Sequence, residues 1–363
     1  MRAWTTQTLL ICGGVYRPRT ADRVAPPDRH GALSSILPGM SILKGKSILI
    51  TGGTGSFGRW FVRRILAEHE PARLVILSRD ELKQYEFAAE LDHDPRVRFF
   101  IGDVRDSERL WRAFDGIQIV IHAAALKQVP AAEYNPFEAI KTNIHGAQNV
   151  IDASLDRNVE RVIALSTDKA SSPINLYGAT KLVSDKLFVA ANAYAGAKPT
   201  RFAVVRYGNV VGSRGSVVPF FKRLAPSGVL PITDERMTRF WITLDQGVDF
   251  VIDMLGVMHG GELFVPKIPS MRVVDLARAM APEARLDVVG IRPGEKLHEQ
   301  MISVDDARRT VDAGRFYIVE PDVDWWDGSV WASATPVPEG FSYTSDTNPE
   351  WLTLEQLRTM IGA

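Results

Sequence analysis

Two side chains with the spacing of a dehydrogenase-type base follow an apolar stretch near the middle of the sequence. Tyr177 and Lys181 lie four residues apart, so on a helix they share one face. An ammonium beside a phenol lowers the pKa of the phenol from about 10 toward the working range, which would make Tyr177 a usable base. Thr167 lies just past the apolar stretch, where its hydroxyl could hold the substrate oxygen that loses its proton.

An additional acid and base, Asp168 and Lys169, lie between Thr167 and Tyr177. In isolation, a charge pair in a loop is usually a solvated salt bridge. A reductase, however, needs only the hydroxyl, the tyrosine and Lys181. The extra pair therefore suggests a second reaction that follows hydride transfer, and we expect all five residues to be catalytic.

A glycine-rich turn, TGGTGSFG over residues 51–58, directly follows the apolar run Ser47–Thr51 and opens an amphipathic stretch. Its glycines permit a tight turn and a close approach of backbone N–H groups to a pyrophosphate, and the N-terminus of a helix favours an anion. The strand–turn–helix context predicts a dinucleotide site instead of a simple glycine turn.

The end of the second strand indicates which dinucleotide binds. An NAD enzyme has a carboxylate there for the ribose 2′-hydroxyl, whereas a 2′-phosphate needs a cation. In the sequence SRDELK (78–83), Arg79 and Lys83 are one helical turn apart, and the planar guanidinium suits a phosphate. Asp80 either caps the following helix or binds a free ribose. We predict NADP as the cofactor.

Further along, Asp103 is placed to meet an adenine edge or to cap a helix, and the small residues of HAAALKQ (122–128) would let a nicotinamide ribose lie against the backbone, with Lys127 reaching toward a ligand. The complete set of predicted cofactor-binding residues is Gly52, Thr54, Gly55, Ser56, Phe57, Gly58, Ser78, Arg79, Asp80, Lys83, Gln84, Asp103, Val104, Ala123, Lys127, Tyr177, Lys181 and Val210.

Short apolar runs alternate with longer amphipathic stretches, which predicts a doubly wound α/β fold of the Rossmann type with a parallel sheet buried on both faces. The runs are Ser47–Thr51, Leu74–Ser78, Val97–Ile101, Ile117–Ala124, Arg161–Ser166 and Arg201–Arg206. After Tyr207, glycines and prolines separate shorter elements, as in a smaller lobe that closes over a ligand. We expect a disordered N-terminal extension over residues 1–40, an NADP-binding domain over 41–207, a substrate-binding lobe over 208–322 that returns in part to the main domain, and a C-terminal tail over 323–363.

Composition narrows the classes of partner. The 363 residues include 43 basic and 43 acidic side chains, and this zero net charge argues against nucleic acid as the main partner. The single cysteine, Cys12, excludes an intrachain disulfide, and no Cys/His spacing predicts a metal site. No stretch reaches the roughly 18 apolar residues of a membrane span. We expect a cytoplasmic protein without a metal and outside the membrane.

Several long motifs together carry a family resemblance. They are ILITGGTGSFG, SRDELKQYE, STDKASSPINLYGATK, RYGNVVGSRGSV, ITDERMTRFWIT and GIRPGEKLHE. From about Ile42 to its C-terminus, the chain resembles the inverting UDP-N-acetylglucosamine 4,6-dehydratases, which are extended short-chain dehydrogenases/reductases that act first in pseudaminic acid biosynthesis.

The resemblance implies a reaction in which the hydride is borrowed and returned. Tyr177 would remove the proton of the sugar O4 while hydride passes from C4 to NADP. Lys169 would then remove the C5 proton, and Asp168 would protonate the departing C6 hydroxyl. The hydride would return to C6, and C5 would be reprotonated from the opposite face, giving UDP-2-acetamido-2,6-dideoxy-β-L-arabino-hex-4-ulose and regenerated NADP.

The same resemblance implies the substrate contacts. Asn209 and Arg239 would contact the substrate, Lys127 would reach it, and Arg292 and Glu295 would hold the diphosphate and the ribose of UDP. Other interpretations stay open: a turn residue at Asn209, a surface residue at Arg239, and a local ion pair between Arg292 and Glu295. Relatives of this type usually assemble, so we expect a homo-oligomer.

Three rival functions remain at this point. A retaining 4,6-dehydratase would use similar groups but return the C5 proton on the original face, which residue types alone do not reveal. A 4-epimerase would not need Asp168 and Lys169. A non-catalytic NADP-binding protein would not need Tyr177 and Lys181 either, and all four residues are present.

Overall fold

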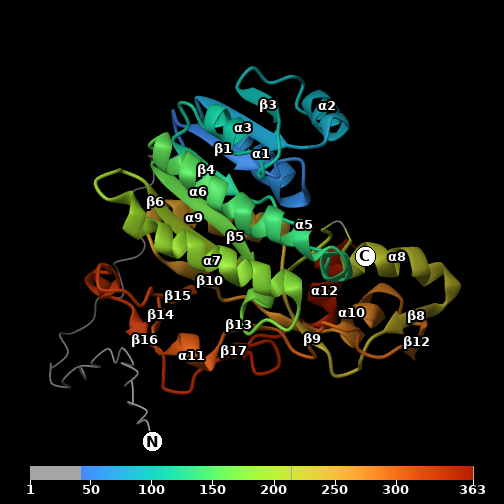
Figure 1. Cartoon of the computed structure of the whole chain (residues 1–363). Helices are drawn as coiled ribbons and strands as arrows, with labels where there is room; N and C mark the ends of the chain where they lie inside the picture. The colour runs from blue at the N-terminus through green and yellow to red at the C-terminus, as the bar shows by residue number, and fades with distance from the viewer. Residues whose placement is uncertain (1–41, 214, 363) are drawn as a thin grey trace, which may run out of the picture. The chain divides into compact units, whose positions relative to one another are not determined.

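The computed structural model describes residues 42–213 and 215–362, so the predicted extension over residues 1–40 lies outside the described residues. A ten-stranded sheet forms the centre of the described chain (Figure 1). Its strands are β1 (Ser47–Thr51), β2 (Arg73–Ser78), β3 (Val97–Ile101), β4 (Ile119–His122), β5 (Arg161–Thr167), β6 (Arg201–Tyr207), β10 (Leu263–Pro266), β14 (Thr310–Asp312), β15 (Phe316–Val319) and β16 (Thr335–Pro336). Their order across the sheet is β16-β14-β15-β10-β6-β5-β4-β1-β2-β3.

The sheet is parallel over most of its width. All neighbouring pairs from β3 to β10 run parallel, whereas β15, β14 and β16 add an antiparallel edge. Ile48–Ile50 and Ile119–Ile121 are fully buried, as expected for strands covered on both faces. The doubly wound α/β fold predicted from the apolar runs is therefore confirmed.

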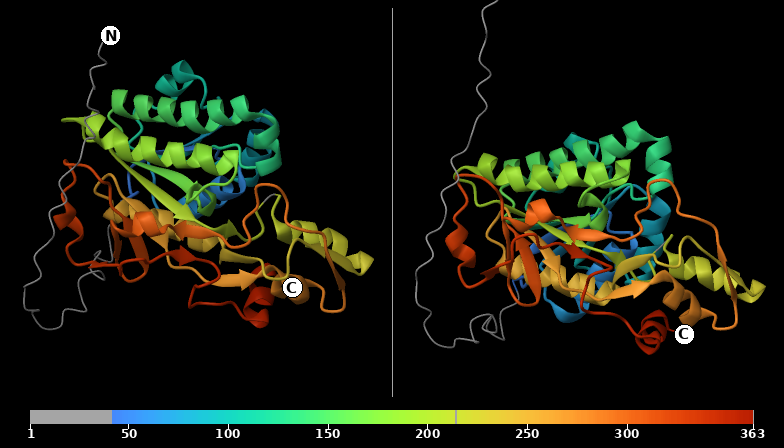
Figure 2. Two further views of the ribbon diagram at one scale, coloured as in Figure 1. Left: turned by 60° about the horizontal axis from the view of Figure 1, so that its bottom comes forward. Right: turned by 90° about the horizontal axis from the view of Figure 1, so that it is seen from below.

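Helices cover both faces of this sheet (Figure 2). They are α1 (Ser56–Glu68), α2 (Glu81–Glu90), α3 (Ser107–Ala113), α4 (Val129–Tyr134), α5 (Pro136–Ile140), α6 (Gly146–Asp156), α7 (Leu176–Ala195) and α9 (Leu244–Val257), with a π-helical turn over Lys141–His145 between α5 and α6. α6 packs on α3 and α7 on one face, and α1 packs on α9 on the other. In α9 the buried Val248, Val251 and Leu255 recur at helical spacing, so one apolar stripe faces the sheet.

A second buried cluster holds together the elements of the smaller lobe, which come from several segments after β6. They are β7 (Asn209–Val210), α8 (Val217–Leu224), the 3₁₀ turn Ala225–Ser227, β8 (Val229–Ile232), β9 (Thr238–Ile242), β11 (Ser270–Arg272), α10 (Val273–Met280), β12 (Arg285–Val288) and α12 (Leu354–Ile361). Phe221, Leu230, Trp241, Leu276 and Leu357 form the centre of this cluster. The smaller lobe thus has its own apolar core.

The final segment of the chain, predicted as a tail over 323–363, packs onto both parts. β16 joins the edge of the main sheet, β17 (Tyr343–Thr344) pairs with β13 (Gln300–Ile302), and α12 packs against α10. Two further short elements are the helix α11 (Val304–Ala307) and the 3₁₀ turn η4 (Gly328–Trp331). Trp331 is buried against the rings of Phe264 and Phe316.

The strand order reverses between β1 and β4, because β2 and β3 extend the sheet on one side and β4 to β6 on the other. Loops that leave neighbouring strands at such a reversal diverge, and the crevice at the carboxyl ends of the strands is where ligands bind in these folds. The glycine turn after β1 and the motif after β5 both lie at this edge. In the described part of the chain, no helix has the length and apolarity to cross a bilayer.

Candidate active site

A cavity of about 960 Å³ opens at the carboxyl edge of the sheet, between the parallel strands and the smaller lobe. Every site residue predicted from the sequence lines this cavity, with one exception. The exception is Gln84, which is buried and donates from Nε2 to the carbonyls of Ser78 and Phe100 at 3.0 and 2.9 Å. Gln84 therefore ties the ends of β2 and β3 together beneath the cavity instead of facing it.

The glycine turn after β1 has the shape that a dinucleotide needs. Gly52 adopts φ +67°, and a Cβ there would lie 2.9 Å from the backbone of Ala124. A Cβ on Gly58 would lie 2.5 Å from Gly53, so α1 can approach the turn only with glycine at this position. Gly55 is the N-cap of α1 and makes no side-chain hydrogen bond there. Gly55 and Ser56 line the cavity, so the positive end of the dipole of α1 lies at the cavity. The turn fits a pyrophosphate.

Charged residues surround the corner of the cavity beyond β2. Asp80 caps α2 by accepting from the backbone N–H of Lys83 at 3.0 Å, and the Lys83 ammonium also pairs with this carboxylate. The Arg79 guanidinium is half exposed and lies 3.9 Å from Asp103 Oδ2. Of the two alternatives for Asp80, helix capping is therefore observed, and Arg79 is the cation at this corner, in a loose ion pair with Asp103.

Asp103 does not cap the following helix, contrary to one of its two predicted roles. Asp106 takes that position and accepts from the backbone N–H of Arg109 at 2.9 Å. Asp103 accepts instead from the backbone and the guanidinium of Arg105, at 3.0 and 2.7 Å. It lines the cavity as a charged, locally paired group.

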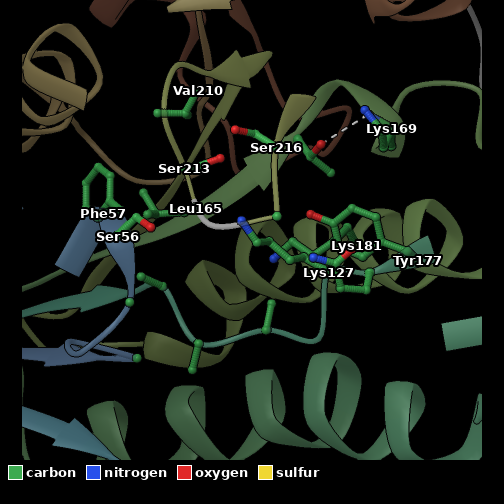
Figure 3. A pocket seen from close by; sticks show the side chains of 18 of the residues that line it. Ser56, Phe57, Lys127, Leu165, Lys169, Tyr177, Lys181, Val210, Ser213 and Ser216 are labelled. Carbon is green, nitrogen blue, oxygen red and sulfur yellow. Dashed lines mark hydrogen bonds between the residues drawn. The ribbon is translucent and has the colours of Figure 1, made fainter. Parts of the chain in front are cut away.

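The catalytic helix begins beside the short turn η2 (Asp168–Ala170) that follows β5. Asn175 caps α7 by accepting from Gly178 N–H at 2.8 Å, which places Tyr177 in the first turn and Lys181 one turn later. A Cβ on Gly178 would lie 2.1 Å from the Lys169 carbonyl, so only glycine lets α7 pack this tightly against η2. Figure 3 shows Tyr177, Lys181 and Lys127 gathered on one side of the cavity, with Lys169 beyond them.

The pKa of Tyr177 differs from the sequence-based expectation. Burial of the phenol raises its pKa to about 12, although the Lys169 ammonium and the Thr167 hydroxyl act in the opposite direction. The predicted lowering by Lys181 is thus not observed. Burial also lowers the pKa of Lys181, although Asp185 acts in the opposite direction. The Lys181 ammonium therefore loses its proton more easily than the ammonium of a free lysine does.

Asp168 and Lys169 form a partly buried pair, in which Asp168 is buried and the Lys169 side chain is 25% exposed. Lys169 Nζ lies 3.1 Å from Asp168 Oδ1, and the Asp168 side chain is 1% exposed. Burial and the nearby Glu299 raise the pKa of Asp168, against the effect of Lys169. Although burial alone would lower the pKa of Lys169, the carboxylates of Asp168 and Glu299 raise it. The pKa values of both groups are thus raised, so each holds its proton more tightly than the free side chain does.

The predicted substrate residues other than Lys127 come from the segments after Tyr207 and line the same cavity. Asn209 and Glu295 each keep one buried oxygen, Oδ1 and Oε2, with no hydrogen-bond partner among residues 42–213 and 215–362. Arg239 is 8% exposed, so it is not the surface residue of the alternative interpretation. Arg292 lies 3.8 Å from Glu295, which is the local ion pair considered from the sequence, and both side chains line the cavity.

Glu299 is the charged residue of the cavity that the sequence analysis did not single out. It is 1% exposed, and its Oε1 lies 3.0 Å from Lys169 Nζ. Glu299 ends the motif GIRPGEKLHE, which also contains Arg292 and Glu295. A second glutamate in a ligand-binding motif was the available signal, but only the folded chain shows that it meets Lys169.

Comparison with known sequences places the chain in a family. Residues 48–321 match the family described as "Polysaccharide biosynthesis protein". A relative from Campylobacter jejuni subsp. jejuni serotype O:2, named UDP-N-acetylglucosamine 4,6-dehydratase (inverting), is 57% identical over 87% of this chain and 97% of its own. A relative from Rickettsia bellii, named UDP-glucose 4-epimerase, is 41% identical over 76% of this chain and 83% of its own.

Solved structures share the fold. Pen from Bacillus thuringiensis superposes with a TM-score of 0.81 and 35% identity, over 88% of this chain and 98% of that one. DesIV, a dTDP-glucose 4,6-dehydratase from Streptomyces venezuelae solved with NAD and TYD bound, gives a TM-score of 0.63 and 25% identity over 69% and 86%. The chain therefore belongs to the polysaccharide biosynthesis protein family and, within the extended short-chain dehydrogenase/reductase fold, to the inverting UDP-N-acetylglucosamine 4,6-dehydratases.

Proposed function

We propose that the chain converts UDP-N-acetylglucosamine into the 4-keto-6-deoxy sugar of inverted C5 configuration, by dehydration across C5 and C6. The observation that carries this proposal is the ion pair of the buried Asp168 with Lys169 in the same cavity as Tyr177 and Lys181. A site for hydroxyl oxidation alone does not need a second acid and base. The relative from Campylobacter jejuni, whose printed name describes this reaction, supports the same conclusion.

The side chains divide the reaction into an oxidation at C4 and an elimination across C5 and C6, after which the hydride returns to C6 and a proton to the opposite face of C5. Thr167 holds the sugar O4, and Tyr177 removes its proton as a phenolate that Lys181 stabilises, which leaves Tyr177 as the neutral phenol. A dinucleotide bound in the cavity supplies the acceptor, and later the donor, of one hydride. Once C4 is a ketone, the C5 proton is acidic, so Lys169 removes it while Asp168 gives its proton to the C6 oxygen, which leaves as water.

Burial of Asp168 supports its role as the acid, whereas the carboxylates of Asp168 and Glu299 raise the pKa of Lys169 and oppose its role as the base until Asp168 is protonated. Elimination needs a protonated Asp168 and a neutral Lys169. The ion pair gives this neutral form when one proton moves from the ammonium to the carboxylate. The pair as a whole keeps the same charge in both forms. Burial favours the neutral form because it disfavours both charges, and it raises the pKa of Asp168 in the direction that a general acid requires.

We propose NADP as the dinucleotide. Arg79 at the corner beyond β2 supports this choice, because its guanidinium can pair with a 2′-phosphate. Asp80 already accepts from the backbone N–H of Lys83 and pairs with the Lys83 ammonium, so it is a poor partner for a ribose 2′-hydroxyl. Gly52, Gly55 and the N-terminus of α1 would hold the pyrophosphate.

The wall formed by the smaller lobe is assigned to the nucleotide sugar. Arg292 would bind the diphosphate, and Glu295 the ribose through the oxygen that lacks a partner in the described structure. Asn209 and Arg239 would contact the substrate beside the catalytic residues. As the first enzyme toward pseudaminic acid, the protein would work in the cytoplasm as a homo-oligomer, with no nucleic acid as partner.

A 4-epimerase is the second candidate, because relatives with that name are about two-fifths identical in sequence. Incubation with UDP-N-acetylglucosamine and no added dinucleotide, followed by mass spectrometry and by proton NMR of the sugar, separates the two functions. The proposed function predicts a product that has lost one water. A product of unchanged mass with inverted C4 would instead establish the epimerase, and recovery of unreacted substrate by a dinucleotide-loaded protein would contradict both.

A further inference from the structure

One buried carboxylate in the cavity has no role in the chemistry above. Glu299 lies immediately before β13, is 1% exposed and lines the cavity. Its Oε1 lies 3.0 Å from Lys169 Nζ and 3.7 Å from Arg239 Nε. Its other oxygen, Oε2, is buried and has no hydrogen-bond partner among the described residues.

The Lys169 ammonium therefore bridges two carboxylates from distant parts of the chain. Asp168 Oδ1 lies 3.1 Å away within η2, and Glu299 Oε1 lies 3.0 Å away on the segment that leads into β13. Arg239 supplies the second positive charge and is itself fixed, because its Nη1 donates to the carbonyls of Thr238 and Leu297 at 2.7 and 3.1 Å. Burying an unpaired carboxylate is costly, so these four groups form one neutral unit.

The surroundings of Lys169 determine how strongly it holds a proton. The titratable and charged side chains that act on it from the packed elements are Asp168, Glu299, Arg239, Tyr177 and Lys296. Burial alone would lower the pKa of Lys169, and the two carboxylates reverse that effect. Because Asp168 must carry the proton during elimination, Glu299 is the carboxylate that stays charged beside Lys169 throughout. Its own pKa supports this: Lys169 and Arg239 lower it despite the burial of the group.

We propose that Glu299 is a positioning residue for the proton transfer at C5, which holds the Lys169 amine in place and stabilises the ammonium that forms there. The inference rests on the proposed dehydratase function. When Lys169 is neutral, one of its N–H groups donates to Glu299, which turns the amine lone pair away from that carboxylate. When Lys169 takes the C5 proton, the new ammonium gains the full attraction of Glu299.

Glu299→Gln tests the charge, and Glu299→Asp tests the position. Glu262→Gln is the matched control, because Glu262 is fully buried but lies outside the cavity, where it accepts from the backbone N–H groups of His259 and Gly260. The first readout is the pH dependence of Lys169 acetylation in the substrate-free protein, measured by mass spectrometry. We expect Glu299→Gln to move the midpoint of labelling down by about one pH unit or more, because a neutral amide no longer stabilises the ammonium.

The second readout separates the two steps of the reaction with UDP-N-acetylglucosamine. In Glu299→Gln, C4 oxidation should proceed at nearly the parental rate, while water loss slows by about tenfold or more and its rising pH limb moves to lower pH. Glu299→Asp should keep the labelling midpoint near that of the parent but still slow water loss. Glu262→Gln should change neither readout.

The outcomes that overturn the inference are distinct from those that contradict the function. A folded Glu299→Gln protein with the parental labelling curve and pH profile would show that Glu299 is merely structural. If Glu299→Gln does not fold, Glu299→Asp decides, because parental water loss in that variant would equally overturn the inference. A parent chain that yields no dehydrated product contradicts the dehydratase itself, and the role of Glu299 at C5 falls with it.

Discussion

At the scale of single residues, burial makes both Tyr177 and Asp168 hold their protons more tightly than free side chains do. For Asp168 this matches its role, since a general acid must still be protonated near neutral pH. For Tyr177 burial opposes the proposed role of base, and positive charge and hydrogen bonding in the cavity act against the effect of burial. Lys169 already acts in that direction. The same cavity therefore favours proton donation at C6 more readily than proton removal at O4.

Asp168→Asn should separate the two halves of the reaction. The amide fills the same space but has no proton to give, so we expect water loss to fall by about 10²- to 10⁴-fold while C4 oxidation persists. Single-turnover absorbance of the reduced dinucleotide reports the first half, and mass spectrometry of the sugar reports the second. Asp115→Asn, which changes an exposed partner of Arg157, is the control. Equal loss of both halves in Asp168→Asn would contradict the assignment.

At the scale of elements, the sequence predicted the strands that carry the cofactor turn and the catalytic motif. Ser47–Thr51 and Val97–Ile101 match β1 and β3 in full, and the other four runs differ from their strands by one to two residues at an end. Strands buried on both faces are long apolar runs, which is why they were visible. The strands β7, β9 and β11 were not predicted, because they lie outside the regular alternation of strands and helices and pair with one another across intervening segments of the chain.

The turn after β1 provides a test at this scale. Gly52→Ala should weaken dinucleotide binding by about tenfold or more, because the new methyl group would collide with the backbone of Ala124 and shift the turn. Isothermal titration with NADP and with NAD measures the effect. Gly45→Ala is matched to it, since Gly45 has nearly the same φ of +70° but open space around a Cβ. That control should lose about 1 kcal/mol of stability and no affinity. Unchanged affinity in Gly52→Ala would refute the role of the turn.

At the scale of the whole molecule, the contacts that complete the site join segments far apart in the sequence. Glu299 reaches Lys169, and Trp331 packs against Phe264 and Phe316 on the main sheet. Neither contact follows from local pattern, because each depends on how the smaller lobe and the final segment fold back. Residue types and motifs predicted which side chains line the cavity. Which of these charged side chains pair with each other is seen only in the folded chain.

Trp331→Ala tests whether the final segment is part of the stable core. Removing this buried ring should cost about 3–5 kcal/mol of unfolding free energy, because it leaves a cavity beside the sheet. Urea unfolding followed by circular dichroism measures the change. Trp351→Ala, at a ring that is 37% exposed, should cost far less. A loss in Trp331→Ala as small as that expected for Trp351→Ala would contradict a contribution of Trp331 to the stable core.

The most direct test of the account is the fate of hydrogen at C5. The protein is incubated with UDP-N-acetylglucosamine in deuterated water, without added dinucleotide, and the sugar is followed by proton NMR. Proton removal by Lys169 and inversion predict a 4-keto-6-deoxy product that carries deuterium at C5 and has the L-arabino configuration. A D-xylo product would contradict inversion, and a product with its original C5 hydrogen would contradict proton removal by Lys169.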